Sequence, residues 1–273
     1  FTATLSAASG QQVTVAYASS NGTATAGADY TASSGTLTFA AGTTTQTFTV
    51  PVLADTTDEA NETATLTLSN ASNASISDAT GTLTITDDDS APSLSINDVT
   101  MSNENAANAT FTATLSAASG QQVTVAYASS NGTATAGADY TDSSGTLTFA
   151  AGTTTQTFTV PVLADSMDEA NETAILTLSN ASNASISDAT GTLTITDDDS
   201  APSLSINDVT ASNENAANAT FTVTLSAASG QTVTVNYATS NDTLSFTAAD
   251  IATSANGAVD VHVADMDGDG DLD

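Results

Sequence analysis

The stretch Phe158–Ser179, FTVPVLADSMDEANETAILTLS, carries a strand pattern on each side of an acidic run. Apolar residues alternate with threonine or similar residues in Phe158–Val162 and again in Leu176–Leu178. A period of two places one set of side chains in a core and the other in solvent. The run between these segments holds four carboxylates: Asp165, Asp168, Glu169 and Glu172. The stretch therefore predicts two half-buried strands joined by an acidic loop.

The same pattern recurs along the chain. FTATLSAASGQ begins at Phe1 and at Phe111, and FTVTLSAASGQ begins at Phe221, so each start lies 110 residues after the last. A repeat of this length is a whole domain rather than a solenoid unit. The first two copies differ at only a handful of positions, which indicates a recent duplication.

Each period contains several more alternating runs, separated by turns rich in Gly, Asn and Ser. They lie at Phe111–Leu115, Val123–Tyr127, Leu147–Phe149 and Leu193–Ile195, and Leu204–Ile206 opens the next copy. About seven short strands per repeat predict an all-β fold built from antiparallel β-sandwiches. Tyr127, Phe149 and Phe158 are expected in the core. Pro161 lies inside a run, which predicts an edge strand or a bulge.

These patterns predict four segments. Residues 1–90 are copy 1 without its first strand, and residues 91–200 are copy 2, the complete one. Residues 201–242 are a truncated copy 3, and residues 243–273 begin a different module. Because the chain starts inside the pattern, we expect it to be an excerpt of a longer protein.

Charge is the most unusual feature of the composition. The chain has 31 acidic residues, no lysine or arginine, one histidine and no cysteine. Two like charges about 4 Å apart repel by roughly 1 kcal/mol in water and roughly 4 kcal/mol at an effective dielectric near 20. Cations must therefore come from solvent, while nucleic acid is not expected as a partner and anionic membranes are poor partners. The sequence contains no run of about 18 apolar residues, so it predicts no membrane span.

Catalysis is not expected. The single histidine, His262, alternates with Val261 and Val263 and is expected on the polar face of a strand, so it supports no convincing Ser–His–Asp arrangement. The chain has no cysteine nucleophile. Paired carboxylates hydrolyse glycosides in some enzymes, but here no tryptophan or arginine accompanies them to hold a sugar.

The acidic runs have the chemistry of a hard-cation site. Calcium takes six to eight oxygen ligands, whereas zinc and copper favour His and Cys. Magnesium keeps several waters, so a high carboxylate count favours calcium. A solvated acidic loop is the alternative. The fixed spacing between the run at Asp165–Glu172 and a second run at Asp197–Asp199 favours a metal site.

Three motifs, in this order, resemble the Calx-β domain: GADYT at Gly137–Thr141, the stretch Phe158–Ser179, and GTLTITDDD at Gly191–Asp199. The resemblance covers roughly residues 1–242. It implies an immunoglobulin-like sandwich with calcium held in loops at one end, close to the following domain.

The resemblance also implies the ligands. In copy 2 they are Glu104, Asp139, Asp165, Glu169, Glu172, Asp197, Asp198 and Asp199. In copy 1 they are Asp29, Asp55, Glu59, Glu62, Asp87, Asp88 and Asp89.

The C-terminal ADMDGDGDLD is a separate calcium-loop pattern. Asp265, Asp267, Asp269 and Asp273 occupy positions one, three, five and nine of a DxDGDGxxD loop, and the backbone carbonyl of Asp271 is expected to join them as a ligand. The glutamate that a full EF-hand carries at position twelve is not in the sequence. The segment resembles the start of an FG-GAP or VCBS repeat, with a dockerin-like loop as the alternative.

These observations predict a non-catalytic, calcium-stiffened spacer in a large secreted or cell-surface protein of adhesion type, of bacterial origin. Its expected partners are calcium ions and neighbouring repeats, with a host or matrix protein or a glycan as a further candidate. The alternative is a ligand-binding adhesive module or a calcium sensor.

Overall fold

The computed structural model describes residues 1–105, 108–210 and 218–240, and within these ranges the chain forms strands and no helix. The all-β prediction is confirmed. Residues Phe1–Thr232 form one compact unit. His262 and the motif at Asp265–Asp273 lie outside the described residues. In the described part of the chain, no helix is long and apolar enough to cross a membrane.

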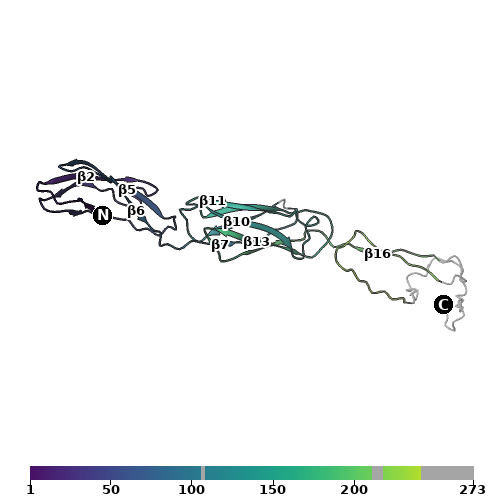
Figure 1. The fold of residues 1–273 in the computed structure, drawn as a ribbon. Coiled ribbons are helices and arrows are strands. Elements are labelled where there is room, and N and C mark those ends of the chain that lie inside the picture. The colour runs from purple at the N-terminus through teal and green to yellow at the C-terminus, as the bar shows by residue number, and fades with distance from the viewer. Residues whose placement is uncertain (106–107, 211–217, 241–273) are drawn as a thin grey trace, which may run out of the picture. The chain divides into compact units, whose positions relative to one another are not determined.

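Copy 2 is a sandwich of two sheets (Figure 1). One sheet has the order β11 (Ser144–Phe149), β10 (Val123–Asn131), β13 (Glu172–Ser182), β15 (Thr190–Ile195) and β8 (Val99–Thr100). The other has the order β12 (Thr155–Pro161), β9 (Asn108–Leu115), β7 (Ser93–Ile96) and β14 (Ser185–Ile186). Neighbouring strands are antiparallel except for two short parallel pairs, β15–β8 and β14–β7. The sandwich prediction is confirmed, with these two edge pairs as the exceptions.

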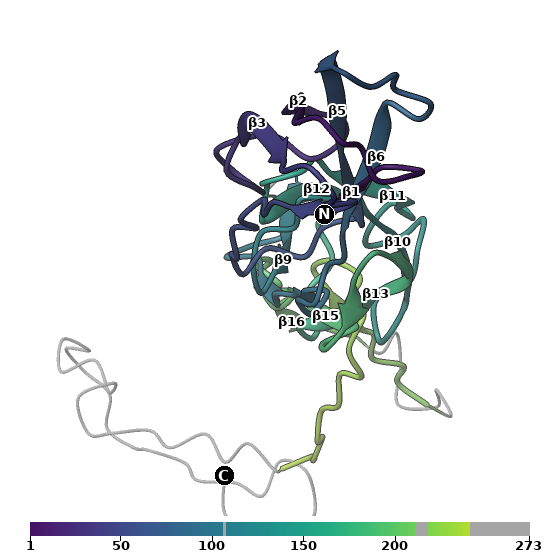
Figure 2. The same ribbon diagram turned by 60° about the vertical axis from the view of Figure 1, so that its left-hand side comes forward.

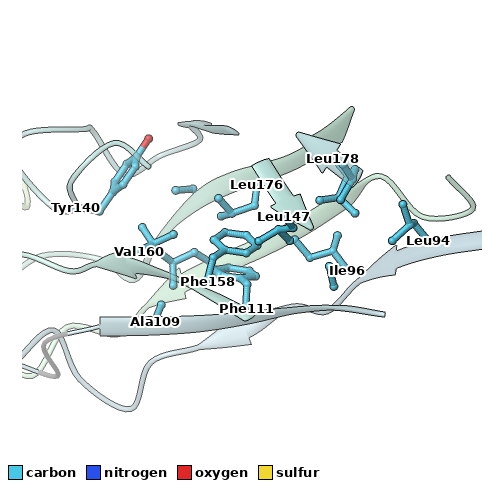
Figure 3. Close-up of a cluster of buried hydrophobic side chains, with 14 of the residues drawn as sticks. Leu94, Ile96, Ala109, Phe111, Tyr140, Leu147, Phe158, Val160, Leu176 and Leu178 are labelled. Carbon is cyan, nitrogen blue, oxygen red and sulfur yellow. The ribbon is translucent and has the colours of Figure 1, made fainter. Parts of the chain in front are cut away.

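The core of copy 2 consists of the apolar residues of the alternating runs (Figure 3). Phe111, Phe149 and Leu176 are fully buried. Phe158 stacks on Tyr127 with ring centroids 3.9 Å apart and on Phe111 at 5.5 Å. The three aromatic residues expected in the core therefore lie in it or pack against it, while the intervening threonines face outward.

Pro161 is the last residue of β12, which forms an edge of its sheet. It pairs with Asn108, the first residue of β9. A proline lacks the backbone N–H that a central strand needs, so an edge position costs no ladder hydrogen bond. The edge-strand prediction is confirmed.

Copy 1 repeats four strands of the larger sheet with the same register and has no counterpart of β8 among them. Its order is β3 (Ser34–Phe39), β2 (Val13–Asn21), β5 (Glu62–Ser72) and β6 (Thr80–Ile85). Val13 pairs with Phe39 as Val123 pairs with Phe149. The second sheet is only β1 (Thr2–Thr4) with β4 (Thr45–Thr47), so the core is divided into two smaller clusters.

Copy 3 contributes one strand pair. β16 (Leu204–Ile206) runs antiparallel to β17 (Val223–Leu225), and the apolar residues of both strands are exposed. Within the described residues, copy 3 therefore lacks a second sheet to cover this pair.

Candidate calcium centres

Strand register brings distant acidic runs to one end of the copy 2 sandwich. Asn131, at the end of β10, pairs with Ala174 near the start of β13, and Glu172 pairs with Ile195 at the end of β15. Figure 2 shows β10 and β13 side by side. The loops at 132–143, 162–171 and 196–200 therefore all leave the same end. Copy 1 repeats this arrangement, with Asn21 opposite Ala64 and Glu62 opposite Ile85.

A tight turn fixes the carboxylate of Asp139. Gly137 adopts φ 88°, a conformation that favours glycine, and its N–H donates to the Tyr140 carbonyl at 2.8 Å. Oδ2 of Asp139 accepts a hydrogen bond from the Thr135 N–H at 2.6 Å. The buried Tyr140 hydroxyl donates to Asn131 Oδ1 at 2.8 Å. One carboxylate oxygen thus holds the turn, and the same carboxylate lies beside those of Glu169 and Glu172.

Backbone hydrogen bonds join the two acidic runs of copy 2. The Glu169 N–H donates to Asp197 Oδ1 at 3.1 Å, and the Asp197 N–H donates to Asn171 Oδ1 at 3.2 Å. In copy 1 the equivalent distances are 3.1 and 3.0 Å. Asn61 and Asn171 stand out in sequence only as Asn-x-Thr patterns that are expected by chance, so their role in joining the runs was not predicted. Their signal was present: both copies place Asn between the two glutamates of the acidic run.

In the part of the chain that the structure describes, three groups of carboxylates have oxygens within 4.8 Å of one another. They are Asp29, Glu59 and Glu62; Asp139, Glu169 and Glu172; and Glu104, Asp197 and Asp199. The copy 1 group lines a cavity of about 130 Å³ that is also lined by Asp55, Asp87, Asp88 and Asp89. The structure thus brings the predicted copy 1 residues together around one cavity and divides most of the copy 2 residues between two groups.

The remaining predicted residues of copy 2 lie beside these groups. Asp165 Oδ1 accepts the Met167 N–H at 2.7 Å, which closes a turn, and Asp55 does the same with Thr57 in copy 1. Both oxygens of Asp198 lie 2.9 Å from Asn105 Nδ2. Asp198 is therefore held by an amide, an interaction that the sequence did not indicate.

Mutual repulsion and burial act on these acids. Burial, followed by a hydrogen bond with Asp139 and its charge, raises the pKa of Glu172 from 4.5 to about 7. Burial, followed by a hydrogen bond with Asp199 and the nearby carboxylates, raises the pKa of Glu104 to about 7. The pKa values of Glu59, Glu62, Asp89 and Glu169 are also raised, with desolvation as the largest cause and neighbouring carboxylates next.

Glu104 has a buried carboxyl group with one oxygen that lacks a hydrogen-bond partner. Its side chain is only 7 % exposed, and its Oε1 has no hydrogen-bond donor. Asp199 Oδ2, in the same group, is also buried without a partner. A buried polar atom without a partner costs about 1–3 kcal/mol, and more when it is charged. Because the chain has no lysine or arginine, no basic side chain of its own can neutralise these oxygens.

The chemistry of the donor set selects the ion. The groups offer only carboxylate oxygens, joined by amide and backbone oxygens nearby, with no histidine or cysteine. Such a set suits calcium. The three groups therefore fit calcium sites.

Comparison with known proteins gives the family. The Calx-beta domain model matches residues 3–89, 87–199 and 197–256, which together span most of the chain. No curated protein matches the chain significantly.

Solved structures that match include two Calx proteins. The apo-form Calx CBD1 domain is 26% identical; the alignment covers 40% of this chain and 98% of that one, with a TM-score of 0.37. CBD12 from CALX1.2 is 20% identical; the alignment covers 71% of this chain and 92% of that one, with a TM-score of 0.36. The assignment rests on the family model, whose matches follow the observed repeats. The chain belongs to the Calx-beta domain family of calcium-binding β-sandwich modules, and Ca²⁺ is its cofactor.

Proposed function

We propose that this chain is a non-catalytic spacer whose tandem copies are stiffened by calcium, within a large secreted or cell-surface protein of adhesion type from a bacterium. The ligands in copy 2 are the groups around Glu104 and Glu172, and the ligand in copy 1 is the group around Glu62. Calcium supplies the positive charge that the chain itself lacks.

The main support for calcium binding is the buried carboxylate of Glu104, whose Oε1 has no hydrogen-bond partner. Native folds contain few such groups, and an unobserved ion is one established explanation for them. The other two groups repeat the same chemistry without full burial. The protein is therefore expected to hold its working shape when these sites are filled.

The near-identity of the copies supports the spacer role. The short connection between copy 1 and copy 2 supports it as well. β6 ends at Ile85 and β7 begins at Ser93, so a short segment that contains Asp87–Asp89 connects copy 1 to copy 2. The same carboxylates line the copy 1 cavity. An ion bound there contacts carboxylates of the connecting segment and so restricts rotation between the copies.

Scattering from the full chain tests the stiffening. We expect a narrower distribution of dimensions in millimolar calcium than in EDTA. A double variant, Glu169→Gln with Asp198→Asn, is expected to lose part of this difference. Equal distributions in calcium and in EDTA would remove the spacer mechanism.

Affinity separates the spacer from a calcium sensor. Extracellular calcium modules bind at about 10⁻⁴–10⁻³ M, whereas sensors bind at about 10⁻⁷–10⁻⁵ M. We expect calorimetric titration to give dissociation constants in the weaker range. Submicromolar binding would favour the sensor.

We extend the proposal to the C-terminal motif at Asp265–Asp273, which we infer to be a further calcium loop of FG-GAP or VCBS type. Its support is the alternation of Asp and Gly in the sequence. Removal of two carboxylates, Asp267→Asn with Asp269→Asn, is expected to lower the number of bound calcium ions by one. An unchanged stoichiometry would overturn this assignment.

A further inference from the structure

A turn of each copy lies against the acidic loop of the copy before it. We define the Ser-Gly turn as the SAASGQ segment, which is Ser116–Gln121 in copy 2 and Ser226–Gln231 in copy 3. The acidic loop is residues 54–62 in copy 1 and 164–172 in copy 2. Both contacts fall within the compact unit Phe1–Thr232.

The first contact is made by three hydrogen bonds to Asp58. The Ser119 hydroxyl lies 2.7 Å from Asp58 Oδ2 and 3.2 Å from its carbonyl oxygen, and the Gly120 N–H donates to that carbonyl at 2.9 Å. Ser119 is 2 % exposed and Asp58 is 8 % exposed. A buried carboxylate that accepts hydrogen bonds from a hydroxyl is a specific partner for that hydroxyl. Asp58 therefore faces the next copy and is absent from the copy 1 calcium group.

Gly120 also touches a member of that group. A Cβ at position 120 would lie 2.7 Å from Glu59 Cγ and 2.8 Å from Glu59 Oε1. Only glycine leaves this space free, so the side chain of Glu59 rests directly on the backbone of the next copy. Glu59 shares the copy 1 group with Asp29 and Glu62.

The second junction repeats the first. The Ser229 hydroxyl lies 2.9 Å from Asp168 Oδ2, and the Gly230 N–H donates to the Asp168 carbonyl at 3.0 Å. A Cβ at Gly230 would lie 2.7 Å from Glu169 Oε1. The recurrence of all three features shows that the contact is a property of the repeat rather than of one loop.

We propose that the Ser-Gly turn is the docking partner of the preceding acidic loop, and that docking and calcium binding at that loop are energetically coupled. Docking places Glu59 within its group, and a filled group holds the loop in the docked form. Coupling between two equilibria is reciprocal. The coupling rests on the proposed calcium-binding function; the docking contact itself does not.

Copy 1 provides a matched control for substitutions in the turn. Its own Ser-Gly turn, Ser6–Gln11, has the same internal bonds: Ser9 Oγ accepts the Gln11 N–H at 3.0 Å, as Ser119 Oγ accepts that of Gln121. A Cβ at Gly10 meets nothing within 4 Å. Gly10→Ala therefore makes the same chemical change as Gly120→Ala without touching an acidic loop.

Calorimetric titration of the full chain with calcium tests the coupling. Gly120→Ala is expected to weaken binding at one class of sites by about fivefold or more, the range typical of coupled sites, while Gly10→Ala leaves binding unchanged. Ser119→Ala, which adds no atoms, is expected to act in the same direction. If all three variants bind calcium like the parent chain, the coupling is wrong.

An engineered disulfide tests docking independently of calcium. The chain has no cysteine, so Asp58→Cys with Ser119→Cys creates a single possible bridge. We expect this pair to oxidise readily, and faster in calcium than in EDTA, whereas Asp58→Cys with Ser9→Cys stays reduced. Equal oxidation of the two pairs would overturn the docking contact. If the parent chain binds no calcium yet the first pair still oxidises selectively, the proposed function fails and the docking contact stands.

Discussion

At the scale of single residues, the chain builds its sites from acids that cannot all be ionised comfortably at once. Glu104, Glu172 and their neighbours have raised pKa values because burial and adjacent carboxylates oppose their charge. In a protein with mixed charges a lysine or arginine compensates such groups. This chain has no lysine or arginine, so without bound cations these carboxylates keep their mutual repulsion.

Substitution of Glu104 separates these two effects. Glu104→Gln removes a buried charge, so we expect a higher melting temperature in EDTA. The same change removes a ligand, so the calcium-induced gain, about 2.7 kcal/mol per site at 100 times the dissociation constant, falls. Thermal melts with and without calcium measure both.

Asp142→Ala is the matched control for that substitution, because copy 1 has Ala32 at the equivalent position. It removes a carboxylate outside the three groups and is expected to leave the calcium-induced gain unchanged. If calcium stabilises Glu104→Gln as much as it stabilises the parent chain, Glu104 is not a ligand.

Acidity changes stability with a predictable sign. The folded-state pKa values of Glu104 and Glu172 are about 7, above the ordinary 4.5, so between these values the folded state binds more protons than the unfolded state. Stability of the calcium-free protein therefore falls as pH rises through this window. We expect a higher melting temperature near pH 5 than near pH 8 in EDTA. In calcium the trend reverses, because protonated carboxyls bind the ion poorly; a calcium-free stability that rises with pH would contradict this.

At the scale of elements, the strands were predictable because alternation is a local signal. The runs at Phe111–Leu115 and Phe158–Val162 became β9 and β12 because their apolar residues fill one core. The two-residue strands β8 and β14 were missed, since two residues carry no period.

Which acids form the sites could also be predicted from the sequence. How the copy 2 acids divide into two separate groups could not. The groups around Glu104 and Glu172 follow from the strand register, which sets the loops that meet at one end. Asp168 belonged to the acidic run in sequence, yet its partner Ser229 lies in another copy. No local pattern reveals such a contact.

A pair of equivalent phenylalanines tests how complete each core is. Phe158 is 7 % exposed and stacks on Tyr127, whereas Phe48 stacks on Tyr17 but is only half-buried. Phe158→Ala is expected to lower the free energy of unfolding by about 3–5 kcal/mol, and Phe48→Ala by less. Urea unfolding followed by circular dichroism measures both. An equal or larger cost for Phe48→Ala would show that the copy 1 core is as well packed as that of copy 2.

At the scale of the whole molecule, a net charge of −31 acts on every part of the fold. Self-repulsion of this size opposes a compact state. Under the proposed function calcium relieves it at the three groups, while monovalent salt screens it everywhere. The two kinds of cation therefore have distinguishable effects.

The dependence of the melting temperature on salt measures the charge repulsion that is spread over the whole molecule. The screening length falls from about 30 Å at 0.01 M salt to about 3 Å at 1 M. In EDTA we expect the melting temperature to rise across this range of sodium chloride, and in saturating calcium to rise less. Equal salt dependence in the two conditions would mean that bound ions do not relieve the repulsion.

The docking contact between each acidic loop and the next Ser-Gly turn has a consequence for how such genes change in length. Asp58 and Ser119 are 61 positions apart, and so are Asp168 and Ser229. Unequal recombination that inserts or deletes one whole 110-residue period, wherever it breaks, leaves each aspartate opposite a serine of the following unit. An array built this way gains or loses reach in whole steps without having to evolve a new interface.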